Sequence, residues 1–386
     1  MTTLRWGVIG AGRFGLIHAR TIRSLSQCRL VALCNRNADR LEAARAEFPE
    51  ATAYSDYREL LADASIDVVS ITTHWREHAA VAIDALAAGK HVLLEKPLAS
   101  SVEECRRVLD AASGSTGKLL VGHICRFDPR VALAKQAIDS GRIGRIVSMH
   151  AKRNLPRAPG HIRLDKISPL MGDGIHDADL MMWFLGRAPS RVFAREVRVD
   201  PFRYADIGWA MLEFDSDAIG VVETNWRLPE NTPTVIDARM EVIGTDGSLT
   251  IDCSATGLSV LDGAGMKSLD TDYWPTVFGQ PTGVLRSEIE YFAECIRHDR
   301  PVEIITPAEA ARAVAVMQAA EEAHVANSRS SFKQTRHARP ALPPQLSCSR
   351  IHDCLTESSY EGSKFFGLSF CDRSQENSSL GVCEVA

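Results

Sequence analysis

The stretch Leu4-Arg5-Trp6-Gly7-Val8-Ile9-Gly10-Ala11-Gly12-Arg13-Phe14-Gly15 decides the fold of this chain. A short, mostly apolar run is followed by glycines at positions 10, 12 and 15, and then by apolar side chains at helical spacing. Gly10 permits a tight turn, Gly12 lets the backbone approach a pyrophosphate, and Gly15 lets the helix pack closely on the strand. The pattern predicts a dinucleotide site formed by Gly10, Gly12, Arg13, Phe14 and Gly15. The alternative is a glycine-rich turn that only connects two elements.

The second expected strand, residues 29–34, ends in Asn35-Arg36. An acidic side chain at this point binds the ribose hydroxyls of NAD, whereas an arginine accommodates the 2′-phosphate of NADP. No carboxylate is present to repel a phosphate, and the guanidinium of Arg36 can pair with one. The sequence therefore favours NADP over NAD. Two alternatives stay open: Arg36 is a solvated loop residue, and Asn35 binds the ribose as an aspartate would.

Strand and helix patterns alternate along the first third of the chain, and strand patterns with hairpin turns dominate after residue 143. Strands are expected at 66–71, 91–94 and 119–122, a hairpin around Asp246-Gly247, and helices at 77–88, 102–112, 174–185, 284–297 and 307–325. Alternation predicts a doubly wound parallel sheet. The predicted class is thus α/β: a Rossmann domain (1–125), then an α+β domain with a largely antiparallel open sheet (126–334) for substrate binding and oligomerisation.

The lysine of Leu93-Leu94-Glu95-Lys96-Pro97 follows an apolar run that is typical of a buried strand. Open α/β sheets bind ligands beyond the carboxyl ends of their strands, so Lys96 is expected at the ligand site. Alone, the Glu-Lys-Pro triplet is more typical of a surface lysine before a turn. The glycine fingerprint and the alternating units favour a role in chemistry.

A second group of polar residues is Gly172-Asp173-Gly174-Ile175-His176-Asp177-Ala178-Asp179, which leads into an apolar helical run. On a helix, His176 and Asp179 share a face, and Asp173 lies at the start, where a carboxylate is favourable. A histidine titrates near neutral pH and can take a proton from a hydroxyl while hydride leaves the same carbon. Alternatively, Asp173 caps the helix and His176 is a hydrogen-bonded core residue.

Composition narrows the classes of partner. The net charge of −5 over 386 residues gives no reason to expect nucleic acid or an acidic membrane surface as a partner. The first ten residues lack a signal-peptide pattern, and no apolar run approaches the roughly 20 residues that cross a bilayer. The ten cysteines lack metal-ligand spacing. We therefore expect a cytoplasmic protein with reduced thiols and no metal site.

Three motifs, in order, resemble the glucose-fructose oxidoreductase, inositol dehydrogenase and MocA family (Gfo/Idh/MocA) of NAD(P)-dependent oxidoreductases: the glycine fingerprint, residues 87–97 and residues 174–179. The resemblance covers roughly residues 3–330. It implies that Lys96 polarises the oxygen of a substrate carbinol, that His176 is its acid/base, and that Asp173 belongs to the same catalytic group. The cofactor site then takes in Asn35, Arg36, Thr72, Thr73, His78, Glu95 and Lys96. Substrate binding is expected of Arg126, Arg153 and Asp179.

Within the family, Gly122-His123, residues 126–129 and Arg153 look most like enzymes of nucleotide-linked amino sugars, such as UDP-N-acetylglucosamine 3-dehydrogenases. Two departures matter. The family usually has an aspartate four residues before the histidine, where this chain has Gly172, and often a proline where it has His74. A one-residue shift turns a helical side chain by about 100°, so Asp173 is not expected to reach the substrate unless the helix start is rearranged.

The predicted function is an NAD(P)-dependent oxidoreductase that moves hydride between the nicotinamide and a hydroxyl carbon of a sugar, nucleotide-sugar or polyol. Gly172 leaves an alternative open, a catalytically inactive dinucleotide sensor or regulatory subunit. Lys96 and His176 together favour the enzyme. A homodimer or homotetramer through the C-terminal sheet is expected, and the proline-containing residues 335–386 are expected to form a disordered tail.

Overall fold

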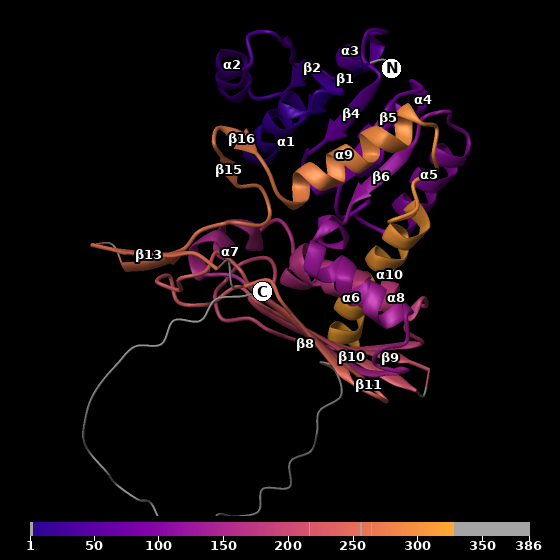
Figure 1. Cartoon of the computed structure of the whole chain (residues 1–386), viewed down its shortest axis with the longest axis vertical. Helices are drawn as coiled ribbons and strands as arrows, with labels where there is room; N and C mark the ends of the chain where they lie inside the picture. Colours follow the sequence, from indigo (N-terminus) through magenta and orange to yellow (C-terminus); the bar gives the residue numbers. More distant parts are fainter. Residues whose placement is uncertain (1–2, 216, 255–256, 264, 328–386) are drawn as a thin grey trace, which may run out of the picture. The chain divides into compact units, whose positions relative to one another are not determined.

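The computed structural model describes residues 3–215, 217–254, 257–263 and 265–327. Two six-stranded sheets organise this part of the chain (Figure 1). The tail expected at residues 335–386 lies outside the described residues. Among the residues that are described, no helix combines the length and the apolar character needed to span a membrane.

The first sheet is parallel throughout. Its strands are β1 (Leu4–Ile9), β2 (Cys28–Cys34), β3 (Thr52–Tyr54), β4 (Val68–Ile71), β5 (His91–Glu95) and β6 (Leu119–Gly122), in the order β3-β2-β1-β4-β5-β6. The prediction of a doubly wound Rossmann sheet is confirmed. The strand order reverses between β1 and β4, and ligands of such sheets bind at the carboxyl ends beside this switch point.

Helices connect these strands. They are α1 (Arg13–Ser24), α2 (Ala38–Glu47), α3 (Tyr57–Ala62), α4 (His78–Ala87) and α5 (Val102–Ser113), with short 3-10 turns η1 (Trp75–Glu77) and η2 (Ile124–Phe127). The sequence predicted a helix after the fingerprint, where α1 lies, and placed α4 and α5 to within a residue, but it missed α2 and α3. The reason is that α2 buries only Ala44 and α3 has six residues, so neither shows a strong apolar period.

The second sheet is largely antiparallel, as predicted. Its strands are β7 (Ile146–Asn154), β8 (Arg191–Val197), β9 (Ile207–Phe214), β10 (Ala218–Asn225), β11 (Asp237–Gly244) and β12 (Ser248–Asp252), in the order β12-β11-β7-β10-β9-β8. Only β7 and β10 pair in parallel. The remaining elements are α6 (Pro129–Asp139), α7 (Arg157–Leu164), α8 (Ile175–Leu185) and the hairpins β13 (Ser259–Asp262) with β14 (Gly265–Ser268) and β15 (Thr276–Val277) with β16 (Gln280–Pro281).

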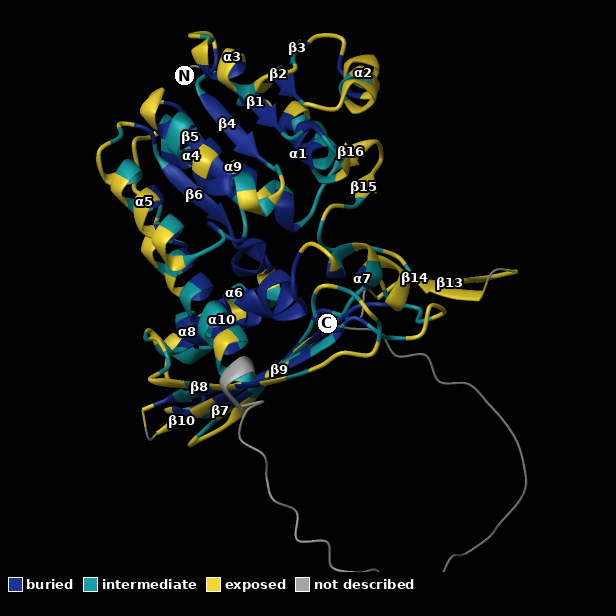
Figure 2. Cartoon of the chain, turned by 180° about the vertical axis from the view of Figure 1, so that it is seen from behind, coloured by how far each residue is buried: buried dark blue, intermediate teal, exposed yellow. Residues whose placement is uncertain are grey.

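The last two helices tie the sheets together. Helix α9 (Val284–Arg297) packs on helix α1 and on strand β5 of the first sheet. The ring of Phe292 in α9 contacts the ring of Trp6 in β1 edge-on. Helix α10 (Pro307–Asn327) contacts α5 and β6 on one side and α8 and β8 on the other. Buried residues of both sheets belong to one continuous core, and Figure 2 colours the buried stretches of the strands dark blue. The carboxyl ends of the first sheet therefore meet the helical layer of the second sheet. The predicted domain boundary at residue 125 stays a prediction.

Candidate active site

The glycine fingerprint forms the turn between β1 and α1. Gly10 has φ +97°, and a Cβ on it would lie 2.7 Å from the backbone of Thr72. A Cβ on Gly15 would lie 2.4 Å from the carbonyl oxygen of Gly10. Gly12 differs, since a Cβ there would meet nothing nearer than 3.8 Å. Two glycines are thus required by packing, whereas Gly12 keeps an open approach to the start of α1.

This turn fits the pyrophosphate of a dinucleotide. The first turn of α1 holds no acidic residue, and no side chain caps its N–H groups, so they remain available to an anion. The hydroxyl of Thr72 donates to the Gly10 carbonyl at 3.0 Å and holds the turn. The buried Thr73 hydroxyl makes no hydrogen bond to any described residue. Arg40, a guanidinium that the sequence prediction did not include, has its NH1 atom 3.8 Å from the Gly12 Cβ position.

The ribose end of the site contains the residues that were expected to choose between NAD and NADP. The Asn35 side chain accepts a hydrogen bond from the Asn37 backbone at 3.0 Å. The Arg36 side chain is 77% exposed and pairs with Glu77 at 2.5 Å. Arg36 is therefore neither buried nor without a partner, and a 2′-phosphate would compete with Glu77 for its guanidinium.

Lys96 lies at the end of β5, where its ammonium donates to the Gly172 carbonyl at 2.6 Å. This bond joins the first sheet to the turn before α8. Burial lowers the pKa of Lys96, and the Asp173 carboxylate opposes that shift. His78 holds the loop behind the lysine, because its two ring nitrogens lie 2.7 Å from the Pro97 carbonyl oxygen and 3.2 Å from that of Thr73. Glu95 lies 3.3 Å from the His18 ring.

The chain forms a π-helical turn at Leu170–Gly174, directly before α8. A π-turn holds one more residue than an α-turn, and such turns are frequent at functional sites. Asp173, displaced by one residue from the family position, is buried there and accepts hydrogen bonds from Trp226 at 2.8 Å and Arg163 at 3.2 Å. Burial alone would raise the pKa of Asp173, but Arg163 and Lys96 bring it below its ordinary value. The helix start is thus rearranged, and Asp173 lies within electrostatic reach of Lys96.

Gly172 leaves room for Trp226. A Cβ at this position would lie 3.0 Å from the indole ring. An aspartate here would push against the residue that now holds Asp173. Gly172 and the shifted aspartate are therefore parts of one arrangement.

His176 lies in the first turn of α8, beside these groups, and is 7% exposed. Its Nδ1 atom makes no hydrogen bond to any described residue. Burial lowers the pKa of His176 well below its ordinary value, and the cations of Lys96, Arg153 and Arg163 add to this shift, as does His123. A neutral imidazole next to an ammonium is the pairing that proton removal from a hydroxyl requires.

The three residues expected to bind substrate are all buried in ion pairs. Arg153 holds Asp177 at 2.8 Å. Arg126 holds Asp179 through two hydrogen bonds of 2.7 and 2.9 Å, and also pairs with Glu309. Direct substrate binding by Arg126, Arg153 and Asp179 stays a prediction.

The sequence missed Arg163, Trp226 and Arg40, because each comes from an element without a motif. Arg163 stacks over the Trp226 ring at 4.5 Å, and only the fold reveals that contact.

Comparisons with known proteins agree with this geometry. Residues 4–123 match the model of the Gfo/Idh/MocA oxidoreductase family with its NAD-binding Rossmann fold, and residues 131–250 match the C-terminal domain of the same family. The chain is 32% identical to inositol 2-dehydrogenase 2 of Saccharopolyspora erythraea, over 71% of this chain and 80% of that protein. It is 30% identical to the NAD⁺-dependent scyllo-inositol 2-dehydrogenase of Bacillus subtilis, over 80% and 90%.

Solved structures share the fold. The scyllo-inositol dehydrogenase of Lactobacillus casei, solved with NAD(H) and scyllo-inositol, aligns with a TM-score of 0.72 at 23% identity, covering 84% of this chain and 98% of that one. These relatives are inositol dehydrogenases, whereas the finer resemblance to nucleotide-sugar enzymes stays a prediction.

Proposed function

The chain belongs to the Gfo/Idh/MocA family of NAD(P)-dependent oxidoreductases acting on hydroxyl carbons, and we propose that its substrate is a cyclic polyol of the inositol type. The observation that carries the assignment is the meeting of Lys96 and the turn before His176, fixed by the 2.6 Å bond to Gly172. The inositol dehydrogenases among its relatives support the cyclic polyol. The comparisons give no support to an inactive sensor.

Each residue has a role that follows from its environment. The nicotinamide, when bound, accepts hydride from the carbinol carbon. Lys96 would move its ammonium from the Gly172 carbonyl to the substrate oxygen and stabilise the alkoxide that develops there. His176, kept neutral by its surroundings, would take the hydroxyl proton. The nearby carboxylate of Asp173 would stabilise the charged form of Lys96. It would also accept a hydrogen bond from a neighbouring hydroxyl of the substrate.

A thermal-shift experiment tests the substrate class. A ligand that binds only the folded state raises the melting temperature, so NAD or NADP alone should raise it. Myo-inositol or scyllo-inositol should raise it further, and only with cofactor bound, because the substrate packs on the nicotinamide. A further shift with UDP-N-acetylglucosamine and none with inositols would transfer the assignment to nucleotide sugars.

For the cofactor, the position of Arg36 supports the binding of NADP as well as of NAD. Arg36→Ala should weaken NADP binding about tenfold or more, since a charge-assisted hydrogen bond contributes about 1.5–3 kcal/mol. NAD affinity should change little. Glu77→Gln is the matched control, because it frees the same guanidinium and should improve NADP binding. Calorimetry measures both affinities for wild type and the two variants, and an equal loss of both cofactors in Arg36→Ala would contradict this role.

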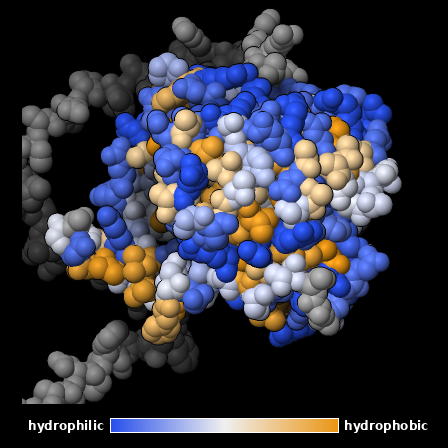
Figure 3. All heavy atoms as spheres, turned by 90° about the horizontal axis from the view of Figure 1, so that it is seen from above, coloured by the Kyte–Doolittle hydropathy of each residue, from blue (hydrophilic) through white to orange (hydrophobic). Residues whose placement is uncertain are grey.

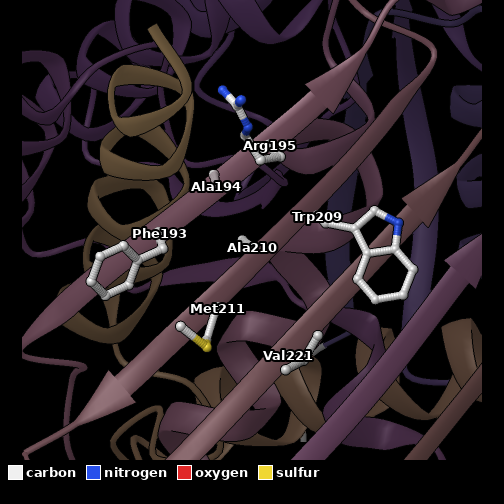
Figure 4. A pocket seen from close by; sticks show the side chains of 7 residues that line it. All are labelled: Phe193, Ala194, Arg195, Trp209, Ala210, Met211 and Val221. Carbon is white, nitrogen blue, oxygen red and sulfur yellow. The ribbon is translucent and has the colours of Figure 1, made fainter. Parts of the chain in front are cut away.

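The open face of the second sheet supports the predicted homodimer. Its outward side chains include Phe193, Trp209, Met211 and Val221, which line a shallow hollow of about 590 Å³ (Figure 4). Three of them, Phe193, Trp209 and Met211, are more than 40% exposed. By contrast, apolar side chains form scattered groups on the largely hydrophilic end seen in Figure 3. Contiguous exposed apolar patches are typical of interaction sites.

A second copy of the chain is the occupant that this face fits. Exposed or partly exposed Arg195 and Arg239 alternate on it with the carboxylates Glu213 and Glu241. Such mixed charge is self-complementary about a two-fold axis.

Met211→Glu combined with Trp209→Glu should convert the dimer to a monomer without loss of secondary structure, because it places charges in the apolar centre of the face. Sedimentation velocity measures the mass. Val260→Glu with Leu261→Glu, on the exposed hairpin β13, is the control and should leave the dimer intact. A wild-type chain that sediments as a monomer at micromolar concentration would contradict the proposal.

A further inference from the structure

His123 is a buried histidine next to the catalytic one. It follows β6 and is 0% exposed. Neither of its ring nitrogens makes a hydrogen bond to any described residue. Its ring meets the ring of His176 edge-on, with centroids 6.2 Å apart and an interplanar angle of 81°. Leaving a buried polar group unpaired is destabilising, so packing alone does not explain a histidine here.

On its other side, His123 faces carboxylates. Its Nδ1 atom lies 3.6 Å from Oδ2 of Asp179. That carboxylate is fixed by Arg126, which also pairs with Glu309 at 3.0 Å. Two carboxylates and one guanidinium leave a formal net charge of −1 behind His123.

The cleft side has the opposite sign. The cations of Lys96, Arg153 and Arg163 lie around His176, and two of them form ion pairs, Arg153 with Asp177 at 2.8 Å and Arg163 with Asp173 at 3.2 Å, so that these five groups carry a formal net charge of +1. A proton that arrives on His176 is therefore repelled from the cleft and attracted toward Asp179. The two rings lie between a cationic region and an anionic one.

We propose that His123, backed by Asp179, is a positioning residue that relieves His176 of the substrate proton during polyol oxidation. The proposal rests on the proposed function. The substrate O–H bond breaks and its proton binds one ring nitrogen of His176. When a turn of the rings brings their nitrogens within hydrogen-bond distance, the proton on the other nitrogen passes to His123, while Asp179 stays ionised and the hydride goes to the bound cofactor. Two protons move, and the imidazole of His176 ends neutral.

The electrostatic surroundings of both rings agree with this order. Burial lowers the pKa of His123, as do Arg126 and Lys96, while Asp179 and Glu95 oppose the shift. Burial lowers the pKa of His176 well below its ordinary value, and Lys96, Arg153, His123 and Arg163 add to this shift. The carboxylate of Asp179, 3.6 Å from His123, favours the protonated form of His123.

The kinetic test uses His123→Gln, which keeps a polar side chain but cannot carry a proton. We expect the turnover number for polyol oxidation at neutral pH to fall at least about tenfold, less than the 10²–10⁴-fold typical of losing the general base itself. The KM for polyol and the cofactor affinity should stay within about twofold, and the remaining rate should rise with pH as hydroxide replaces the lost acceptor. His91→Gln, which removes a partly buried histidine from the far end of β5, is the control and should behave as wild type.

An equilibrium test separates this inference from the proposed function. NMR titration of the ring protons in NAD-bound protein should show that His123 takes up a proton at higher pH than His176. Asp179→Asn should lower the pKa of His123, and Glu309→Gln, which leaves the Asp179–Arg126 bond in place, should lower it less. Protonation of His176 before His123, or wild-type turnover and pH profile in His123→Gln, would overturn the proposal. If the wild type turned over no polyol, the proposed function would be wrong. The NMR titration would still test whether His123 takes up a proton at higher pH than His176.

Discussion

His176→Ala is expected to lower turnover by about 10²–10⁴-fold, the usual contribution of a general acid/base. A carbinol that loses hydride must also lose its hydroxyl proton, and we propose that the buried imidazole of His176, whose pKa is lowered, accepts this proton beside Lys96. Lys96→Ala should have an effect of the same order, because the alkoxide then develops without its cation. Cofactor affinity should change much less in both variants, since neither residue belongs to the fingerprint turn.

Steady-state rates and calorimetry on the same preparations measure the two effects. Lys96→Met retains the packing of the side-chain stem and should be as slow as Lys96→Ala. Lys118→Ala and His298→Ala, which remove a surface ion pair each, are the controls and should keep wild-type rates. Turnover near wild type in His176→Ala would remove that residue from the mechanism.

The direction of the pKa shift of His176 also predicts the pH profile of the oxidation. The neutral imidazole is the reactive form, and its pKa is lowered well below the ordinary value near ~6.5 by burial and by the Lys96 cation. Oxidation should therefore be insensitive to protonation of this residue across neutral pH, and the rate should fall only in more acidic solution. Lys96→Met removes one of the cations, so the acid limb of its profile should move to higher pH.

Gly12→Val is expected to abolish dinucleotide binding without unfolding the protein. A Cβ on Gly12 meets nothing nearer than 3.8 Å in the protein itself, so the cost appears only when a pyrophosphate approaches the backbone. Affinity for NAD and NADP should fall at least about 100-fold, or about 2.8 kcal/mol. The melting temperature of the free protein should stay close to that of wild type.

Gly15→Val provides the contrast. Its Cβ would lie 2.4 Å from the Gly10 carbonyl oxygen and 2.7 Å from the Thr72 hydroxyl, so this variant should lose folding stability as well as binding. Calorimetry and thermal unfolding on both variants distinguish the two roles. Equal cofactor affinity in Gly12→Val and wild type would contradict the placement of the pyrophosphate.

Much of the fold could be predicted because strong local patterns coincide with buried elements. The fingerprint, the strand before Lys96 and the amphipathic α9 were placed to within a residue or two. Helices that bury few side chains, such as α2, were not predicted. The location in the cytoplasm, the two-domain boundary and the roles of the individual site residues stay predictions.

Asp173 shows why the sequence alone could not predict the whole site. Spacing alone placed Asp173 about 100° out of register, which suggested a lost function. The structure shows a π-helical turn there and places Trp226 against Gly172, and the bond from Trp226 to Asp173 joins residues more than 50 positions apart. The catalytic role of Asp173 stays a prediction. Contacts between distant residues also place Arg163 on the ring of Trp226 and pair Arg126 with Asp179, and the sequence alone predicted neither.

The most direct measurement follows the near-ultraviolet absorbance of reduced nicotinamide when wild-type protein is mixed with NAD⁺ or NADP⁺ and a panel of inositols and sugars. The account predicts that the absorbance rises with at least one cyclic polyol, and that Lys96→Ala and His176→Ala suppress the rise although calorimetry shows that both still bind cofactor. Cofactor binding by wild type with no reduction on any polyol or sugar would contradict the account and identify a dinucleotide-binding protein without this chemistry.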